Sequence, residues 1–221
     1  MRAAFPVAMV IALTTLGTAR ARAQAAPEGE SDPTARTHDG FYLRLSLGGG
    51  AIKAKFSGGD KAPDAEGSGG GPMLDVLIGG TPAAGLVVGG GYQFDMAQQA
   101  DYQFGSNSTG SDGNVVRGVI GPFVEWFPDR HGGFSTGLLA GYTMLALQTP
   151  TIRILGTQIG GDINTLGIGG NIWVGYAQWL SSQWALGLEA RAGFASTKNQ
   201  DDSSQTGSAT SWAVLITGVH H

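Results

Sequence analysis

A strict alternation of apolar residues with small or polar residues, repeated eight times, limits what this chain can fold into. The eight alternating segments are residues 41–48, 74–79, 86–95, 116–126, 134–144, 166–177, 184–194 and 212–218. A period of two residues is the signal of a β-strand, and no segment has the period of a helix. The sequence therefore predicts an all-β protein with eight antiparallel strands.

The connections between these segments alternate between short and long. The short connections are Thr81–Gly85, Pro128–Gly133 and Leu180–Gln183. The long connections are polar and rich in Gly, Ser and Asp, and they cover Lys55–Pro72, Met96–Asn114, Gln148–Asn164 and Thr197–Ser208. Tight turns at one rim and long loops at the other are typical of an up-and-down transmembrane β-barrel, whose short side is periplasmic.

The two faces of the predicted strands differ in chemistry. One face carries Leu, Val, Ile, Phe and Trp, and the other carries glycine, small polar residues and almost all the strand charges. A soluble ligand-binding barrel has its apolar face inside. The pattern therefore predicts lipid outside and polar side chains inside, where some of the 38 glycines make room for charged side chains. A secreted soluble barrel that binds a lipophile is the alternative from another class.

The N-terminal residues have a different composition from the rest. Arg2, an apolar run and the sequence Ala21-Arg22-Ala23 predict a cleaved signal peptide over residues 1–23, with a flexible periplasmic tail over 24–39 and a barrel over 40–221. No run is long enough for a transmembrane helix. Cleavage leaves 13 − 3 = 10 basic against 17 acidic residues, which argues against a nucleic-acid partner. The chain has no cysteine and therefore no disulfide or thiolate metal site.

Charged residues on the inward face form the one group with an evident mechanism. We expect a lumen charge network of Arg44, Asp75, Asp95, Arg117, Glu125, Glu189 and Arg191. Buried charges need partners, so the network is either a static plug or a gate. Heights counted from the short turns predict a cross-strand pair of Asp95 with Arg117. They place Arg44 among Asp75 and Glu189.

Aromatic residues cluster near the chain entry and the short turns. They predict a periplasmic girdle of Phe41, Tyr42, Trp126, Phe127, Phe134, Trp179 and Trp184. Aromatics that simply mark strand ends, as in any β protein, are the alternative interpretation.

No catalytic, cofactor or metal site is expected. His38 lies in the tail, His131 in a short turn, and His220 and His221 at the end of the sequence. A general base must come within hydrogen-bond reach of its nucleophile. These positions do not place a histidine beside a nucleophile at the outer rim, so we expect no enzyme.

In its eight segments, alternating connections and inward charges, the chain over Gly40–His221 resembles the small eight-stranded outer-membrane barrels of the OmpA and OmpX type. Such chains usually end in an aromatic residue, whereas this sequence ends Gly218-Val219-His220-His221. The resemblance implies export to the outer membrane of a Gram-negative bacterium, with membrane lipid as a partner.

The function expected is a structural or surface-interaction role, with four long extracellular loops as the contact surface and a lumen closed by the charge network. The alternative is a narrow channel for small solutes. The sequence names no ligand for the loops.

Overall fold

The computed structural model describes residues 38, 40–58, 64–104, 108–149, 152–154, 157–159, 162–199 and 205–221. The predicted signal peptide, and all of the predicted tail except His38, lie outside these residues. No helix in the described part of the chain is long and apolar enough to cross a membrane.

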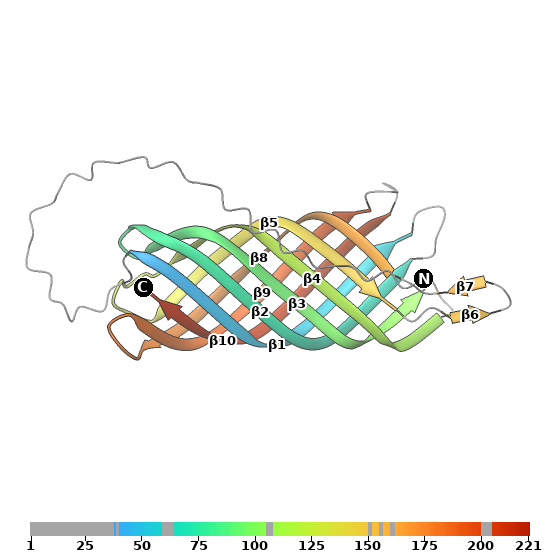
Figure 1. Cartoon of the computed structure of the whole chain (residues 1–221), viewed down its shortest axis with the longest axis horizontal. Coiled ribbons are helices and arrows are strands. Elements are labelled where there is room, and N and C mark those ends of the chain that lie inside the picture. The colour runs from blue at the N-terminus through green and yellow to red at the C-terminus, as the bar shows by residue number, and fades with distance from the viewer. Residues whose placement is uncertain are drawn as a thin grey trace, which may run out of the picture. The chain divides into compact units, whose positions relative to one another are not determined.

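Eight strands form a closed barrel in which neighbours along the chain pair antiparallel and β10 returns to β1 (Figure 1). The barrel strands are β1 Phe41–Ser57, β2 Ala65–Ala83, β3 Leu86–Phe104, β4 Ser108–Trp126, β5 Phe134–Gln148, β8 Asp162–Trp179, β9 Trp184–Lys198 and β10 Thr206–His220. A separate hairpin of β6 (Ile152–Ile154) and β7 (Thr157–Ile159) lies in the connection between β5 and β8. The predicted eight-stranded antiparallel up-and-down barrel is confirmed.

The short turns lie where the alternation predicts them, and the first shows why it needs glycine. Gly85 has a φ of 73°, and the Phe127 amide donates a hydrogen bond of 2.7 Å to its carbonyl oxygen. A Cβ at position 85 would overlap the carbonyl oxygen of Phe127. Only glycine adopts this left-handed conformation without strain, so the turn also fixes where β4 ends.

The long connections are shorter than predicted, and the difference is largest for the first two. The strands continue through most of those polar stretches, so that only residues 58–64, 105–107, 149–161 and 199–205 connect the barrel strands at that end. Residues of Lys55–Pro72 and Met96–Asn114 are mostly paired strand residues. The prediction of long loops is therefore corrected to a tall barrel wall at the first, second and fourth connections, whereas residues 149–161 remain a long connection.

The strands extend because the alternation continues with its polarity reversed. Beyond the apolar belt most of the inward residues are apolar, with Thr165 and Thr197 among the exceptions, and the outward residues are polar. The inward set, which we call the collar core, consists of Ile52, Ala54, Phe56, Ala65, Ala97, Ala100, Val115, Leu145, Leu147, Ala195 and Ala209. A wall with water outside needs an apolar interior, like any soluble barrel. Polar outward residues in a Gly/Ser-rich context have the composition of loops, and for this reason the sequence alone predicts loops where the strands continue.

We call this upper part of the wall the collar. Its described outward residues are Lys53, Lys55, Glu66, Ser68, Asp101, Gln103, Asp112, Asn114, Gln148, Asn164, Ser196, Lys198, Thr206, Ser208 and Thr210. Below it the outward residues are Leu, Ile, Val, Phe, Tyr and Trp, many of them strongly exposed. The wall thus has an apolar belt toward the short turns and a polar collar beyond.

Irregularities interrupt the ladders at several places, and two of them have an evident local cause. The β4–β5 pairing skips from Ile120–Tyr142 to Phe123–Leu139, at Pro122, which has no backbone N–H. The β2–β3 register shifts between Ser68 and Met73, opposite a bulge where Gln99 has a φ of 52°. Bulges of this kind bend and twist a strand.

Candidate functional site

The barrel interior brings together all seven residues of the predicted charge network. They project inward from five strands and are at most 3% exposed. The side chains of Arg44, Arg117 and Arg191 are 2%, 1% and 1% exposed, so water does not reach their guanidinium groups. Charges so deeply buried must be compensated by partners.

Arg117, Arg191 and two aspartates form the upper half of this network. Arg117 and Asp95 are register partners on β4 and β3, and Arg117 Nε donates to Asp95 Oδ2 over 2.7 Å. Arg191 bridges Asp95 and Asp75 from β9. Asp95 therefore accepts from two guanidinium groups at once.

Arg44 organises the lower half. Its Nη1 lies 2.7 Å from Glu125 Oε1, and its Nη2 contacts Glu189. The guanidinium carbon also lies 5.1 Å from the ring centroid of Trp173, within cation–π range. Arg44 was expected among Asp75 and Glu189, but Asp75 binds Arg191 instead. Arg44 contacts Glu125 across the lumen, a pairing that strand heights alone do not reveal.

Neutral polar residues complete the network, and the sequence reading missed them. Asn171 accepts from Arg117 Nη2 over 2.5 Å and donates to Gln93 over 2.7 Å. Gln93 in turn donates to Asp75 over 3.1 Å, which closes a ring of contacts. Ser211 donates to Asp95 over 2.9 Å. Each of these residues has the inward parity of its strand, and that parity is the signal that could have identified them.

One glycine shows how the lumen holds arginine. A Cβ at Gly193 would overlap the Asn171 side chain and both terminal nitrogens of Arg117. Gly193 therefore places no side chain at this inward position of β9, and the guanidinium group of Arg117 occupies the space. Interiors of eight-stranded barrels are only just wide enough for side chains.

A second cluster closes the end of the barrel near the short turns. We call His38, Tyr42, Phe127, Trp179 and His221 the mouth cluster. The His38 ring stacks on Phe127 with a centroid distance of 3.7 Å, and its Nε2 donates to the Gly132 carbonyl over 2.8 Å. His38 belongs to the tail that was expected to be flexible, but it is buried here.

The mouth cluster joins the two ends of the described chain. His38 Nδ1 lies 2.6 Å from His221 Nε2. Because His38 Nε2 carries the hydrogen, its neutral Nδ1 accepts from His221 Nε2–H. The buried Nδ1 of His221 has no hydrogen-bond partner among the described residues. Burial, and then the neighbouring His38 and His220, lower the pKa of His221 to about 3.

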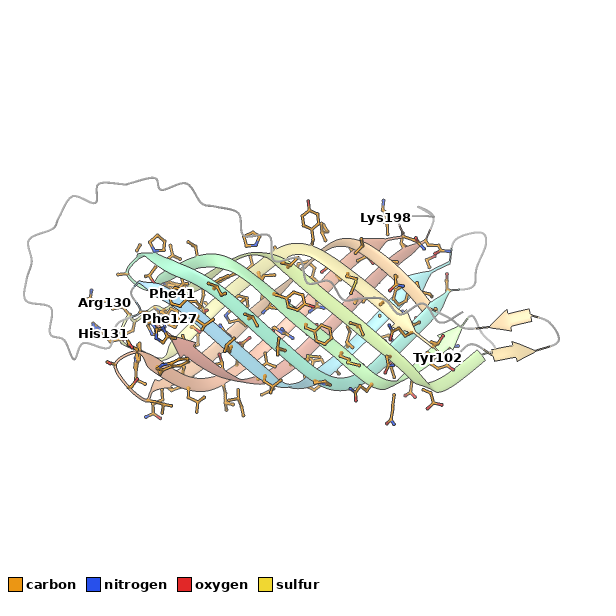
Figure 2. The ribbon with its side chains drawn as sticks, viewed as in Figure 1. Phe41, Tyr102, Phe127, Arg130, His131 and Lys198 are labelled. Atoms are coloured by element: carbon orange, nitrogen blue, oxygen red, sulfur yellow. The ribbon has the colours of Figure 1, made fainter. Side chains whose placement is uncertain are left out.

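Only some residues of the predicted aromatic girdle lie on the outer face of the barrel. Phe41, Trp126, Phe134 and Trp184 face outward, and His220 packs edge-on against Trp184 at a centroid distance of 4.9 Å. Figure 2 shows Phe41, Phe127, Arg130 and His131 at the end opposite Lys198 and Tyr102.

Tyr42, Phe127 and Trp179 correct the girdle assignment, because they turn inward. Tyr42 and Phe127 are buried in the barrel, where Tyr42 donates to Glu125. Trp179 is partly buried against the apolar cluster that contains Tyr42 and Phe127, and its indole N–H donates to the His131 carbonyl over 3.2 Å. All three share the inward parity of their strands, so closeness to a turn was the wrong criterion.

No protein-family model and no curated protein matches the chain. The solved structures that are similar to this chain include the following three. Ail from Yersinia pestis is 12% identical with a TM-score of 0.48, and the match covers 83% of this chain and 99% of that one. OprG from Pseudomonas aeruginosa is 10% identical with a TM-score of 0.46, covering 84% and 97%. Neisserial surface protein A is 14% identical with a TM-score of 0.42, covering 81% and 96%. The chain is thus similar in fold to small outer-membrane β-barrels.

Proposed function

We propose that this chain is an exported outer-membrane barrel with a permanently closed lumen, and that its role is structural or surface-interacting. In this proposal the apolar belt faces lipid, the short turns face the periplasm and the collar stands outside the membrane. Residues 1–23 act as the signal peptide. The collar wall, rather than long loops, presents the contact surface.

The filled lumen is the observation that supports this proposal. Going up β1, the inward residues are first Tyr42, then Arg44 and Ser46, and finally the apolar Ile52, Ala54 and Phe56. The mouth cluster, the charge network and the collar core therefore follow one another along the axis. An ion would have to pass buried salt bridges and then an apolar layer, which costs far more than a wet pore would.

The contacts favour a static plug over a gate. Each network arginine contacts two acceptor side chains or more, and Gln93 and Asn171 lock Arg117 to Asp75 through neutral amides. A buried polar network in which every charged side chain has an oppositely charged partner makes an interior rigid. A gate would need partners that are free to exchange.

Planar-bilayer recording tests the closed lumen. We expect the purified, folded full chain to insert without producing steady single-channel current, because no continuous wet path crosses the three layers. Heat-dependent gel migration of the same sample would show that the barrel is folded. Steady conductance from folded wild-type protein would refute the closed lumen and favour the small-solute channel.

A substitution on the apolar belt tests which face meets lipid. Leu188 on β9 is 60% exposed, and its register partners Ile216 and Tyr176 are also exposed. Leu188→Arg should lower the free energy of unfolding by about 2–4 kcal/mol if this position lies near the bilayer midplane. Urea titration in vesicles, followed by tryptophan fluorescence, measures the change.

Gln148→Arg is the matched control, because Gln148 faces outward from the collar at the end of β5, where its register partners are Asn114 and Asp162. It should change the free energy of unfolding by no more than about 0.5 kcal/mol, as surface substitutions do. Equal effects of the two arginines would show that the belt does not lie in lipid.

We also propose that the protein is not an enzyme. All four histidines lie at the short-turn end of the barrel, in the mouth cluster, the β4–β5 turn or beside Trp184. His38 and His221 hydrogen-bond to each other, and His131 lies beside Asp129 on the exposed turn. None of them is placed to act as a general base on the collar side.

A further inference from the structure

All the described lysines lie on one side of the collar. Lys53 and Lys55 project outward from β1, and Lys198 projects outward from β9. These two strands are the neighbours of β10 in the barrel. Among the described outward residues of β1, β9 and β10 there is no Asp or Glu. Asp101 and Asp112 lie on β3 and β4 instead. We call Lys53, Lys55 and Lys198 the lysine sector.

Hydroxyl-bearing residues of β10 lie between these lysines. Lys53 is the register partner of Thr210, Lys55 of Ser208 and Lys198 of Thr206. All three partners are exposed on the outer wall. Cβ atoms of directly opposed residues lie about 4.5–5.5 Å apart. One phosphate group can therefore accept from an ammonium group and its neighbouring hydroxyl together.

The wall is hollowed at these positions. One hollow of about 480 Å³ is lined by Lys53, Thr210 and Trp212 together with Asp101. Another of about 500 Å³ is lined by Lys55, Thr206 and Ser208 together with Asp64. Asp101 belongs to β3 and Asp64 directly precedes β2, so the favourable place for an anion is over β10.

Trp212 fixes the level of the lysine sector relative to the apolar belt. It is 60% exposed, it lies two residues below Thr210 on the outer face of β10, and Val214 and Ile216 follow below it. Tryptophan prefers the level where hydrocarbon gives way to polar headgroups. The lysines therefore lie just above the edge of the apolar belt.

Glu66 on β2 holds two of the lysines together. Its carboxylate lies 2.7 Å from Lys55 Nζ and 3.6 Å from Lys53 Nζ. The hydrogen bond from Lys55 lowers the pKa of Glu66, so this carboxylate is ionised at neutral pH. The described carboxylates near the sector are those of Glu66, Asp64 and Asp101, and all of them lie on the β2 and β3 side of β1, so the part of the sector over β10 and β9 has no described carboxylate of its own.

We propose that the lysine sector binds the phosphate groups of lipid headgroups in the leaflet around the base of the collar. The inference deepens the proposed function, and it rests on the proposed membrane placement. It names anionic membrane lipid as the partner of one side of the barrel. Each lysine near an anionic surface should raise the affinity roughly fivefold.

Lipid recovery after mild extraction tests this proposal. The full chain is folded into vesicles of equal phosphatidylcholine and phosphatidylglycerol, purified in detergent, and its bound lipids are counted by mass spectrometry. Wild-type protein should retain phosphatidylglycerol well above its share in the vesicle. The triple variant Lys53→Gln, Lys55→Gln, Lys198→Gln should retain the two lipids equally.

Asp112→Asn is the matched control, because Asp112 lies on β4, away from the lysine sector. It should keep the phosphatidylglycerol preference. An undiminished preference in the triple lysine variant would overturn the proposal. So would displacement of the lipid by millimolar glycerol phosphate, which would indicate a site for a soluble anion.

A separate measurement distinguishes the two proposals. Vesicles are washed with carbonate before extraction, and protein that stays with them is embedded in the membrane. Loss of wild-type protein in the wash would overturn the membrane placement and the lipid proposal together. Retention without any lipid preference would overturn only the lipid proposal.

Discussion

Replacing Asp95 by Ala should destabilise the barrel by about 3–5 kcal/mol, because it leaves two buried guanidinium groups without their shared carboxylate. Asp95 contacts Arg117 and Arg191 and accepts from Ser211. Urea unfolding in vesicles measures the free energy. The outward Asp101 on the same strand is the control, and Asp101→Ala should change the free energy by no more than about 0.5 kcal/mol.

The double variant Asp95→Ala, Arg117→Ala should be more stable than Asp95→Ala alone, because it removes one of the stranded charges. The double-mutant cycle then gives a coupling energy of about 1–3 kcal/mol between the two residues. Strict additivity of the two substitutions would show that the pair contributes no interaction of its own. In that case the network would not be the element that closes the lumen.

Acidification should weaken the mouth cluster through His221. Its pKa in the folded state is lowered from 6.5 to about 3. A depressed pKa means that the unfolded chain binds the proton more tightly, so the contribution to stability is complete above about pH 6.5 and is lost as the pH falls toward 3. Over that range the loss should reach about 4 kcal/mol, at roughly 1.4 kcal/mol for each pKa unit.

His221→Phe should flatten this pH dependence. Phenylalanine can keep the ring contacts with Tyr42, Phe127 and Trp179, whose centroids lie 5.1, 5.7 and 5.5 Å from that of His221, but it cannot take up a proton. The free energy of unfolding of both proteins is measured between pH 8 and pH 4. The exposed turn residue His131 supplies the control, since His131→Phe should keep the wild-type slope. Parallel slopes for wild type and His221→Phe would refute the role of His221.

The sequence predicts the strands and the inward residues well, because both depend on one local property, the period of two. Parity alone places Arg44, Asp95 and Arg191 in the lumen. The partners within the lumen depend on contacts across it, as between Arg44 and Glu125, which lie 81 residues apart in the chain. No local pattern contains that information.

The strand lengths and the mouth cluster could not be predicted for related reasons. Assigning strands by outward apolar residues fails at Lys53, where the outward residues change from apolar to polar while the pairing continues. His38 and His221 meet although 183 residues separate them. Their contact exists only because an even number of strands returns the chain to the mouth where it entered.

The reversal of polarity along β1 and β10 means that the height of this barrel can change without altering the apolar belt. Inward and outward positions keep the same parity from Leu45 to Lys55, and from Ile216 to Ser208. Adding or deleting two residues in each of two paired strands would therefore move the connecting loops by about 7 Å and leave every side chain on its own face. Adding or deleting one residue would instead move the inward side chains to the outer face, and the outward side chains to the inner face, beyond the point of change. Insertions and deletions can accordingly make the collar taller or shorter only in steps of two residues per strand.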